Sequence, residues 1–297
     1  MRRPHIVRGA GAVAVALALS ACSAPEPEVT PPASVVAERL VELGTTADAF
    51  SGVAVGRQAI TARAVKDSTL QFWDLADGVR PVTDAATNSA AVPFEELDPG
   101  AVQEQVAQLA KLCEASEFRV SVDVVTPSAM LGELRCGDDT FEGLTTHDPV
   151  AVRLNGSPLP SSMAVSVEET WQVVLDLLAE LDPGLGVGSL SIDADTISLE
   201  LSDGAATQGC RPALVFERDG SDVTNACRRT GQKPAISLAG FTAANLARLQ
   251  LEAMEQAGII GTDRASVSVD SSARLEPQLR VRQGSSEATV AFEQPRA

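Results

Sequence analysis

Alternating apolar and polar residues recur three times along the chain in the pattern apolar-Ser-apolar-Asp. A period of two places the apolar residues on one face of an extended backbone, so each copy predicts a half-buried β-strand. A second alternating run follows each copy, stops at a turn and is followed by a third, which predicts three antiparallel strands per copy. The three copies are Val120-Ser121-Val122-Asp123, Leu190-Ser191-Ile192-Asp193 and Val267-Ser268-Val269-Asp270.

A stretch of helical period precedes each copy. The first helix is predicted to begin at Asp98-Pro99, because Asp caps helix starts and Pro suits the first turn. The second carries an apolar stripe from Val167 to Leu181 that includes Trp171, which predicts a core position for this tryptophan. The third is expected to begin at Thr242 and to end at Gly258, with an apolar run of Leu246, Leu249, Leu251 and Met254.

These patterns predict an α+β protein made of tandem repeats of one helix followed by a three-stranded antiparallel sheet. A weaker fourth copy stands at the front, with a helix from Ser34 to about Leu43 and a strand that ends at Trp73. The expected units span residues 35–83, 92–156, 157–233 and 234–297, with a linker at 84–91. Asn155-Gly156 is typical of a two-residue hairpin turn and marks one joint between units.

The N-terminus combines a basic end with a short apolar run, which predicts a signal peptide over residues 1–21. The run from Gly9 to Leu19 follows three arginines and is too short to span a bilayer as a helix. It ends in Leu19-Ser20-Ala21-Cys22, which resembles the lipobox of bacterial lipoproteins. This resemblance covers only residues 1–22.

The lipobox resemblance implies that the chain is cut before Cys22 and that acyl chains such as palmitate are attached to this cysteine. Such chains would anchor the protein to the extracytoplasmic face of the cell membrane. The alternative is an ordinary secretory signal with a chance cysteine. Residues 22–34 hold four prolines and little apolar surface, which predicts an extended tether between the anchor and the folded part.

Net charge restricts the partners. Removing the three signal-peptide arginines leaves 20 basic against 40 acidic residues, a formal charge of −20. Nucleic acid is not an expected partner, because phosphate binding needs clustered basic residues. Acidic protein also repels anionic lipid, so membrane attachment is assigned to the acyl chains on Cys22.

Four cysteines follow Cys22, an even number that is typical of disulfides in an exported chain. Three pairings are formally open. We expect Cys113–Cys136 and Cys210–Cys227, because each pair then closes a short loop inside one unit. A zinc site is the alternative, although no Cys-x-x-Cys spacing favours it.

Few residues could carry catalysis. His147 is the only histidine after the signal peptide, and no Gly-x-Ser-x-Gly elbow accompanies it, so a catalytic triad is not expected. Carboxylates cluster at helix starts and strand ends. Calcium binding by these carboxylates is an alternative, but the sequence lacks the spaced ligand loop that would predict a calcium site. These clusters are Glu95 with Glu96 and Asp98, Asp138 with Asp139, and Asp193 with Asp195.

The sequence therefore predicts a non-enzymatic protein that binds or scaffolds a protein partner in the cell envelope, with no cofactor and no metal. One alternative is a carrier of lipid or glycolipid between membrane and cell wall, which would need an apolar cavity. Another is a hydrolase with two carboxylates. An aromatic content of 3% disfavours sugar sites, and Trp73 is the residue near which we expect a ligand pocket, if one exists.

Overall fold

A computed structural model of the chain describes residues 32–76, 78–84, 89–115, 117–137, 148–160, 166–181, 186–202, 210–229, 235–262, 265–270 and 277–292. The backbone contacts divide the chain into two units, Met1–Thr30 and Pro31–Ala297, and the described residues all belong to the second unit. The predicted signal peptide, Cys22 and most of the tether therefore lie outside the described residues. Among the residues that are described, no helix is long and apolar enough to span a membrane.

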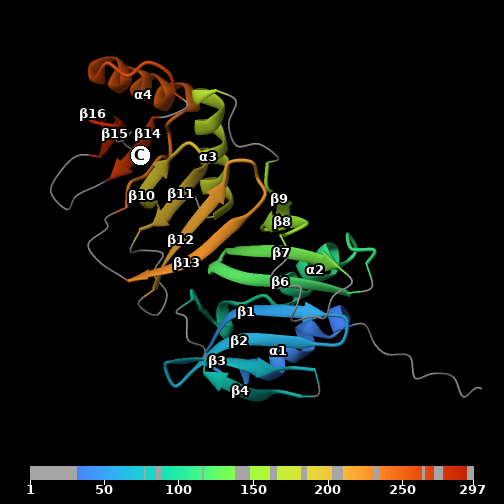
Figure 1. Cartoon of the computed structure of the whole chain (residues 1–297). Coiled ribbons are helices and arrows are strands. Elements are labelled where there is room, and N and C mark those ends of the chain that lie inside the picture. The colour runs from blue at the N-terminus through green and yellow to red at the C-terminus, as the bar shows by residue number, and fades with distance from the viewer. Residues whose placement is uncertain are drawn as a thin grey trace, which may run out of the picture. The chain divides into compact units, whose positions relative to one another are not determined.

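The N-terminal half of this unit forms a nine-stranded antiparallel sheet (Figure 1). Its order is β4-β3-β2-β1-β6-β7-β8-β9, and the short β5 also pairs with β1. Helix α1 packs against α2, and α2 packs on β6 and β7. The bounds are α1 Val36–Gly44, β1 Ala49–Gly56, β2 Ile60–Lys66, β3 Thr69–Asp74, β4 Arg80–Asp84, β5 Val92–Pro93, α2 Pro99–Ala110, β6 Glu117–Thr126, β7 Ala129–Gly137, β8 Ala151–Leu154 and β9 Ser157–Pro158, with short 3-10 helices at Pro32–Ser34 and Phe94–Glu96.

The C-terminal half forms a seven-stranded antiparallel sheet in the order β13-β12-β11-β10-β14-β15-β16. Helix α3 packs against α4, and α4 packs on β15 and β16 (Figure 1). The bounds are α3 Val167–Leu181, β10 Val187–Ile192, β11 Thr196–Leu201, β12 Cys210–Glu217, β13 Val223–Arg229, α4 Ala243–Ala257, β14 Ser266–Asp270, β15 Gln278–Gln283 and β16 Ser286–Ala291.

The predicted tandem repeats of a helix and a separate three-stranded sheet are wrong, because the strands associate differently. Strand β1 pairs with β6, with Val53 opposite Val122, and β10 pairs with β14, with Leu190 opposite Val269. These contacts merge the strands into two continuous sheets. An alternating sequence looks the same in an edge strand and in a central strand. The pattern therefore could not show that β6, β10 and β14 each pair with a strand on both sides.

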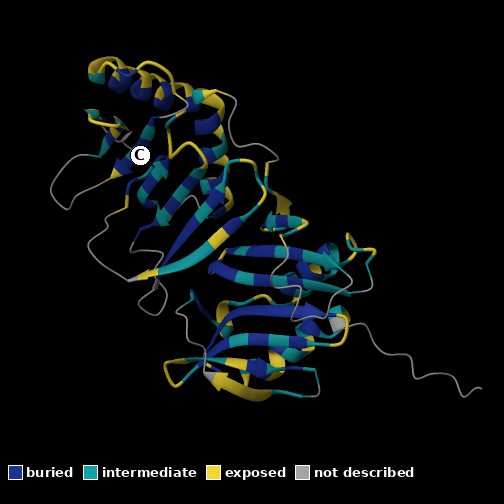
Figure 2. Cartoon of the chain, viewed as in Figure 1, coloured by how far each residue is buried: buried dark blue, intermediate teal, exposed yellow. Residues whose placement is uncertain are grey.

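The apolar-Ser-apolar-Asp segments are confirmed as strands, and they lie at the centres of the sheets. They fall in β6, β10 and β14, except that Asp193 follows the end of β10. Ser191 lies directly opposite Ser268 in the β10–β14 pair. Sequence analysis missed their central neighbour β1, whose residues are buried along its whole length (Figure 2). A strand covered on both faces loses the alternation that reveals a half-exposed one.

The predicted helix ends are confirmed by their hydrogen bonds. The Asp98 side chain accepts from the backbone N–H groups of Gly100 and Ala101 at 2.9 and 3.1 Å. Thr242 Oγ1 accepts from the N–H of Asn245 at 3.2 Å, and Gly258 ends α4 with a φ of 66°. Each side-chain oxygen satisfies a helix N–H that has no partner within the helix.

The last turn of α3 is bound by side chains of the first sheet. Thr126 Oγ1 donates to the carbonyl of Leu181 at 3.2 Å, and Asn155 Nδ2 donates to that of Glu180 at 2.6 Å. These carbonyls lack partners inside the helix. Asn155-Gly156 is confirmed as a turn, with φ values of 50° and 81°, but it joins β8 to β9 within the first sheet. The expected joint between residues 156 and 157 therefore lies inside a hairpin.

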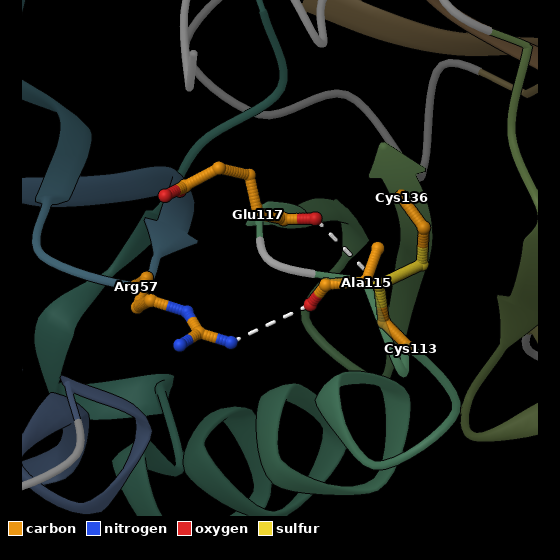
Figure 3. The surroundings of a disulfide bond; sticks show 5 residues. All are labelled: Arg57, Cys113, Ala115, Glu117 and Cys136. Carbon is orange, nitrogen blue, oxygen red and sulfur yellow. Dashed lines mark hydrogen bonds between the residues drawn. A yellow bond between two sulfur atoms is a disulfide. The ribbon is translucent and has the colours of Figure 1, made fainter. Parts of the chain in front are cut away.

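The disulfide between Cys113 and Cys136 is confirmed (Figure 3). It joins the segment after α2 to β7 with a Cα–Cα distance of 5.9 Å, and Arg57 Nη2 donates to the nearby carbonyl of Ala115 at 3.4 Å. Cys227 in β13 is also disulfide-bonded. The side chain of Cys210 lies outside the described residues, so the Cys210–Cys227 pairing stays a prediction.

Replacing Cys113 and Cys136 together by serine should lower the free energy of unfolding by about 3 kcal/mol, because the unfolded chain regains the freedom of the closed loop. The bridge spans 23 residues of sequence. Urea denaturation of the double variant and of the parent chain measures the difference. Equal stability of the two proteins would show that the bridge does not restrict the unfolded chain.

Candidate functional site

A cleft of about 690 Å³ opens in the C-terminal half, beside the first turn of α3, α4 and the strand ends of the second sheet. This volume falls within the range of small-ligand sites, roughly 300–1,000 Å³. Its apolar lining is Val167, Ile192, Ala194, Ala265 and Val267, and its neutral polar lining is Ser166, Thr170, Gln250 and Thr262. Its charged lining is Asp195, Glu217, Arg218 and Asp219.

Arg218 connects three segments that line the cleft: the end of β12, the β10–β11 turn and helix α3. It follows β12, and its Nη1 donates to the carbonyl of Asp193 at 2.9 Å and to that of Ala194 at 3.3 Å. Its Nη2 donates to Thr170 Oγ1 on α3 at 3.5 Å. Its backbone N–H donates to the carbonyl of Asp195 at 2.8 Å. All these acceptors are neutral oxygens, so the guanidinium holds the β10–β11 turn against α3 without neutralising a carboxylate.

Gln250 of α4 brings a buried amide to the cleft. Its side-chain Oε1 accepts from Trp171 Nε1 at 2.9 Å, and Gln250 is only 5% exposed. Because an indole N–H can only donate, this bond fixes the oxygen toward Trp171 and the amide nitrogen away from it. Among the described residues this nitrogen has no hydrogen-bond partner. The cleft is therefore lined by a donor from a largely buried side chain, and acceptor oxygens of a ligand could bind it.

Three carboxylates and one guanidinium form the charged lining of the cleft: Asp195, Glu217, Asp219 and Arg218. Hydrogen bonds from the side chain and backbone N–H of Ser221 lower the pKa of Asp219, and the backbone bond is 2.9 Å long. The lining residues that the structure describes include no imidazole or thiol. This set of groups can bind a polar ligand through hydrogen bonds, and its net charge favours cationic over anionic ligands.

A second, more apolar cleft lies between α3 and residues 236–241. Leu175 and Leu178 of α3 line one side, and Leu238 and Phe241 line the other. Its volume is about 190 Å³, below the range typical of small-ligand sites. The lipid-carrier alternative therefore receives no support from this cleft.

The face of the first sheet opposite the helices carries a charged cluster. Arg63 of β2 forms an ion pair with Asp123 of β6, and the pair crosses β1 at Gly52. A Cβ at Gly52 would collide with both side chains, so a larger residue there would force the ion pair to shift. Arg135 Nη2 lies 3.1 Å from Glu133 Oε2 on β7.

Burial shifts the pKa values of two members of this face. It raises the pKa of Glu133 despite the ion pair with Arg135, and Asp123 and Asp222 add to the rise. It also lowers the pKa of the Arg119 guanidinium, although Asp123 acts in the opposite direction. The cavity at this cluster is only about 20 Å³, too small for an organic ligand.

The structure places only some of the site residues predicted from the sequence at a cleft. Trp73 is 1% exposed, and it lines none of the three cavities described above. Trp171 is fully buried, as predicted. Asp98 caps α2, and Asp195 lines the cleft. Cys22, Asp138, Asp139 and His147 lie outside the described residues, and within the described ranges no group of three or more potential ligands could hold a metal ion.

Sequence analysis missed Gln250 and Arg218. Leu251 was assigned to the apolar side of α4, but it is 50% exposed while Gln250 is buried. Gln250 follows Leu246 by four residues and precedes Met254 by four, so a polar residue on the apolar stripe was the available signal. Arg218 lies in a turn after a strand, where the sequence carries no comparable signal.

The raised pKa of Glu133 predicts a pH-dependent stability. Protonation of Glu133 favours the folded state, so its contribution is fully present below the unfolded pKa of about 4.3 and is lost as the pH rises through the higher folded pKa. Glu133→Gln lacks this loss, so its stability relative to the parent should improve with rising pH across that window. Denaturation over a pH series measures the difference, and Glu38→Gln on the exposed side of α1 should show none.

Gln250→Leu should destabilise the protein by about 1–3 kcal/mol, because Trp171 Nε1 would stay buried without its acceptor. Gln256→Leu, on the exposed side of the same helix, should change the stability by less than about 0.5 kcal/mol. Denaturation followed by tryptophan emission measures both variants. Equal effects of the two substitutions would contradict a specific role for the Trp171–Gln250 bond.

Comparison with known proteins does not assign the chain to a family. No protein-family model and no curated protein matches the chain. Among solved structures, the DNA polymerase III β subunit of Pseudomonas aeruginosa aligns with 90% of this chain and 62% of its own length, at 13% identity and a TM-score of 0.16. The PCNA2–PCNA3 complex of Sulfolobus tokodaii aligns with 88% and 95%, at 10% identity and a TM-score of 0.18.

The Proliferating Cellular Nuclear Antigen of Entamoeba histolytica aligns with 86% of this chain and 93% of its own, at 13% identity and a TM-score of 0.17. The chain thus spans about 62% of the length of the Pseudomonas protein. TM-scores this low support no argument about fold or function. The interpretation of the cleft rests on its own geometry.

Proposed function

We propose that this protein is a lipid-anchored, non-enzymatic binding protein on the extracytoplasmic face of a bacterial cell membrane, where it binds a protein partner. The sequence Leu19-Ser20-Ala21-Cys22 supports the anchor, with acyl chains on Cys22 as the attachment. Residues 22–34 would hold the folded unit away from the lipid surface.

The cleft beside α3 and α4 is the observation that carries the binding role. Its size suits a ligand segment, and the side-chain nitrogen of Gln250 is a donor without a partner among the described residues, so a bound group could accept from it. The acidic groups Asp195, Glu217 and Asp219 add charge selectivity at its rim. After removal of the signal peptide the formal charge of −20 is also suited to partners that carry basic surface.

Cys22→Ala should release the protein from the membrane, because the proposed acyl attachment loses its sulfur. We expect the parent chain in the membrane fraction and the variant in the soluble fraction after cell fractionation. Cys113→Ser, which alters another cysteine, should leave the protein on the membrane. Membrane retention of Cys22→Ala would contradict the anchor.

The binding role is tested by cross-linking the parent chain in intact cells and identifying its adducts by mass spectrometry. A defined protein adduct that disappears when Asp195 and Glu217 are neutralised supports the proposal. A co-purified lipid of defined mass would instead favour the lipid-carrier alternative. The absence of both adduct and lipid would count against a binding role.

A further inference from the structure

We infer that the cleft beside α3 and α4 binds an extended, basic peptide segment of the protein partner. This inference rests on the proposed function and names the chemistry that the cleft would recognise. It depends on the charge of the rim, the orientation of Gln250 and the nature of the remaining lining.

The charges at the cleft select for a cation. Asp195, Glu217 and Asp219 outnumber Arg218, whose guanidinium is already hydrogen-bonded to neutral oxygens. The first turn of α3 adds to this field through Glu168 and Glu169, which lie between the lining residues Val167 and Thr170. Lysine or arginine side chains at this rim would gain charge-assisted hydrogen bonds.

A ligand that matches the cleft should also supply a hydrogen-bond acceptor for the amide nitrogen of Gln250. Trp171 fixes the carboxamide so that its NH₂ group has no partner among the described residues, and Gln250 is 95% removed from solvent. A simple polyamine has cations but no acceptor oxygen, so it would accept no hydrogen bond from this nitrogen. A peptide offers a carbonyl at every residue, which can accept from Gln250 while its side chains reach the carboxylates.

The rest of the lining disfavours other ligand classes. The apolar residues Ile192, Ala265 and Val267 can contact side-chain stems, since lysine and arginine bury their methylene groups while the charge stays exposed. The described lining includes no aromatic ring on which a sugar could stack. Carboxylates at the rim would repel an anionic peptide, despite the positive end of the α3 dipole.

The test uses Trp171 as the reporter of occupancy. Trp73 is the only other tryptophan of the chain, so Trp73→Phe leaves Trp171, bonded to Gln250, as the single emitter. The full-length protein is recovered from membranes in a nonionic detergent. It is titrated with a blocked heptapeptide of alternating lysine and alanine, with the matching glutamate and alanine peptide, and with spermine.

We expect the basic peptide to change the emission of Trp171 saturably and to bind less tightly as salt screens the exposed carboxylates. Spermine should bind about three- to tenfold more weakly, because it cannot accept a hydrogen bond from Gln250. The acidic peptide should not bind. Stronger binding of the acidic peptide, or equal binding of spermine, would overturn the inference.

Matched variants distinguish specific binding at the cleft from non-specific attraction to the negatively charged protein. Asp195→Asn with Glu217→Gln should weaken binding of the basic peptide about three- to tenfold, as two partly exposed ion pairs are lost. Glu38→Gln with Glu255→Gln changes the net charge equally at exposed helix positions and should leave the affinity unchanged. Equal weakening by the two pairs of substitutions would show non-specific attraction and would overturn the inference.

Failure of this inference can be told apart from failure of the proposed function. If the basic peptide does not bind but cells still yield a defined protein adduct at the cleft, the ligand class is wrong and the binding role stands. If neither the peptide nor any adduct is found, both are wrong. Binding of the peptide together with an adduct that maps to a basic segment of its partner supports both.

Discussion

Antiparallel pairing of two central strands is the constraint on which each half of the structure depends. Strand β1 pairs with β6, and β10 pairs with β14, so that successive groups of strands become one sheet. Without these contacts each group would expose an unpaired edge of N–H and C=O groups. The pairing also presents one continuous apolar face in each sheet, over which α1 and α2 or α3 and α4 can bury their apolar stripes.

Helix α3 connects this architecture to the cleft. Its C-terminal carbonyls are bound by Thr126 and Asn155 of the first sheet, while Thr170 near its other end contacts Arg218 at the cleft. Trp171 lies between the buried core and the cleft, because its ring is fully buried and its nitrogen bonds Gln250. The same helix therefore stabilises the fold and fixes the position of two groups that line the cleft, Arg218 and Gln250.

The two polar regions of the molecule differ in what their charges do. On the first sheet, Arg63 pairs with Asp123 and Arg135 pairs with Glu133, so opposite charges satisfy one another. At the cleft, Arg218 binds neutral oxygens and the carboxylates of Asp195 and Glu217 are left to face the opening. Charges that are neutralised internally favour stability, whereas charges that face a cleft can be used for recognition.

The sequence by itself determined the strands that contain Ser121, Ser191 and Ser268 and the helix ends at Asp98, Thr242 and Gly258. It also favoured the Cys113–Cys136 bridge among three open pairings. Periodicity, capping chemistry and cysteine spacing are local, so short segments carry them. Only the tertiary structure decided which strands are neighbours, since a period of two is the same at an edge and at a centre. It also decided that Gln250 rather than Trp73 lines a cleft, because a ligand site depends on groups that lie far apart in the chain and meet only when the helices and sheet pack together.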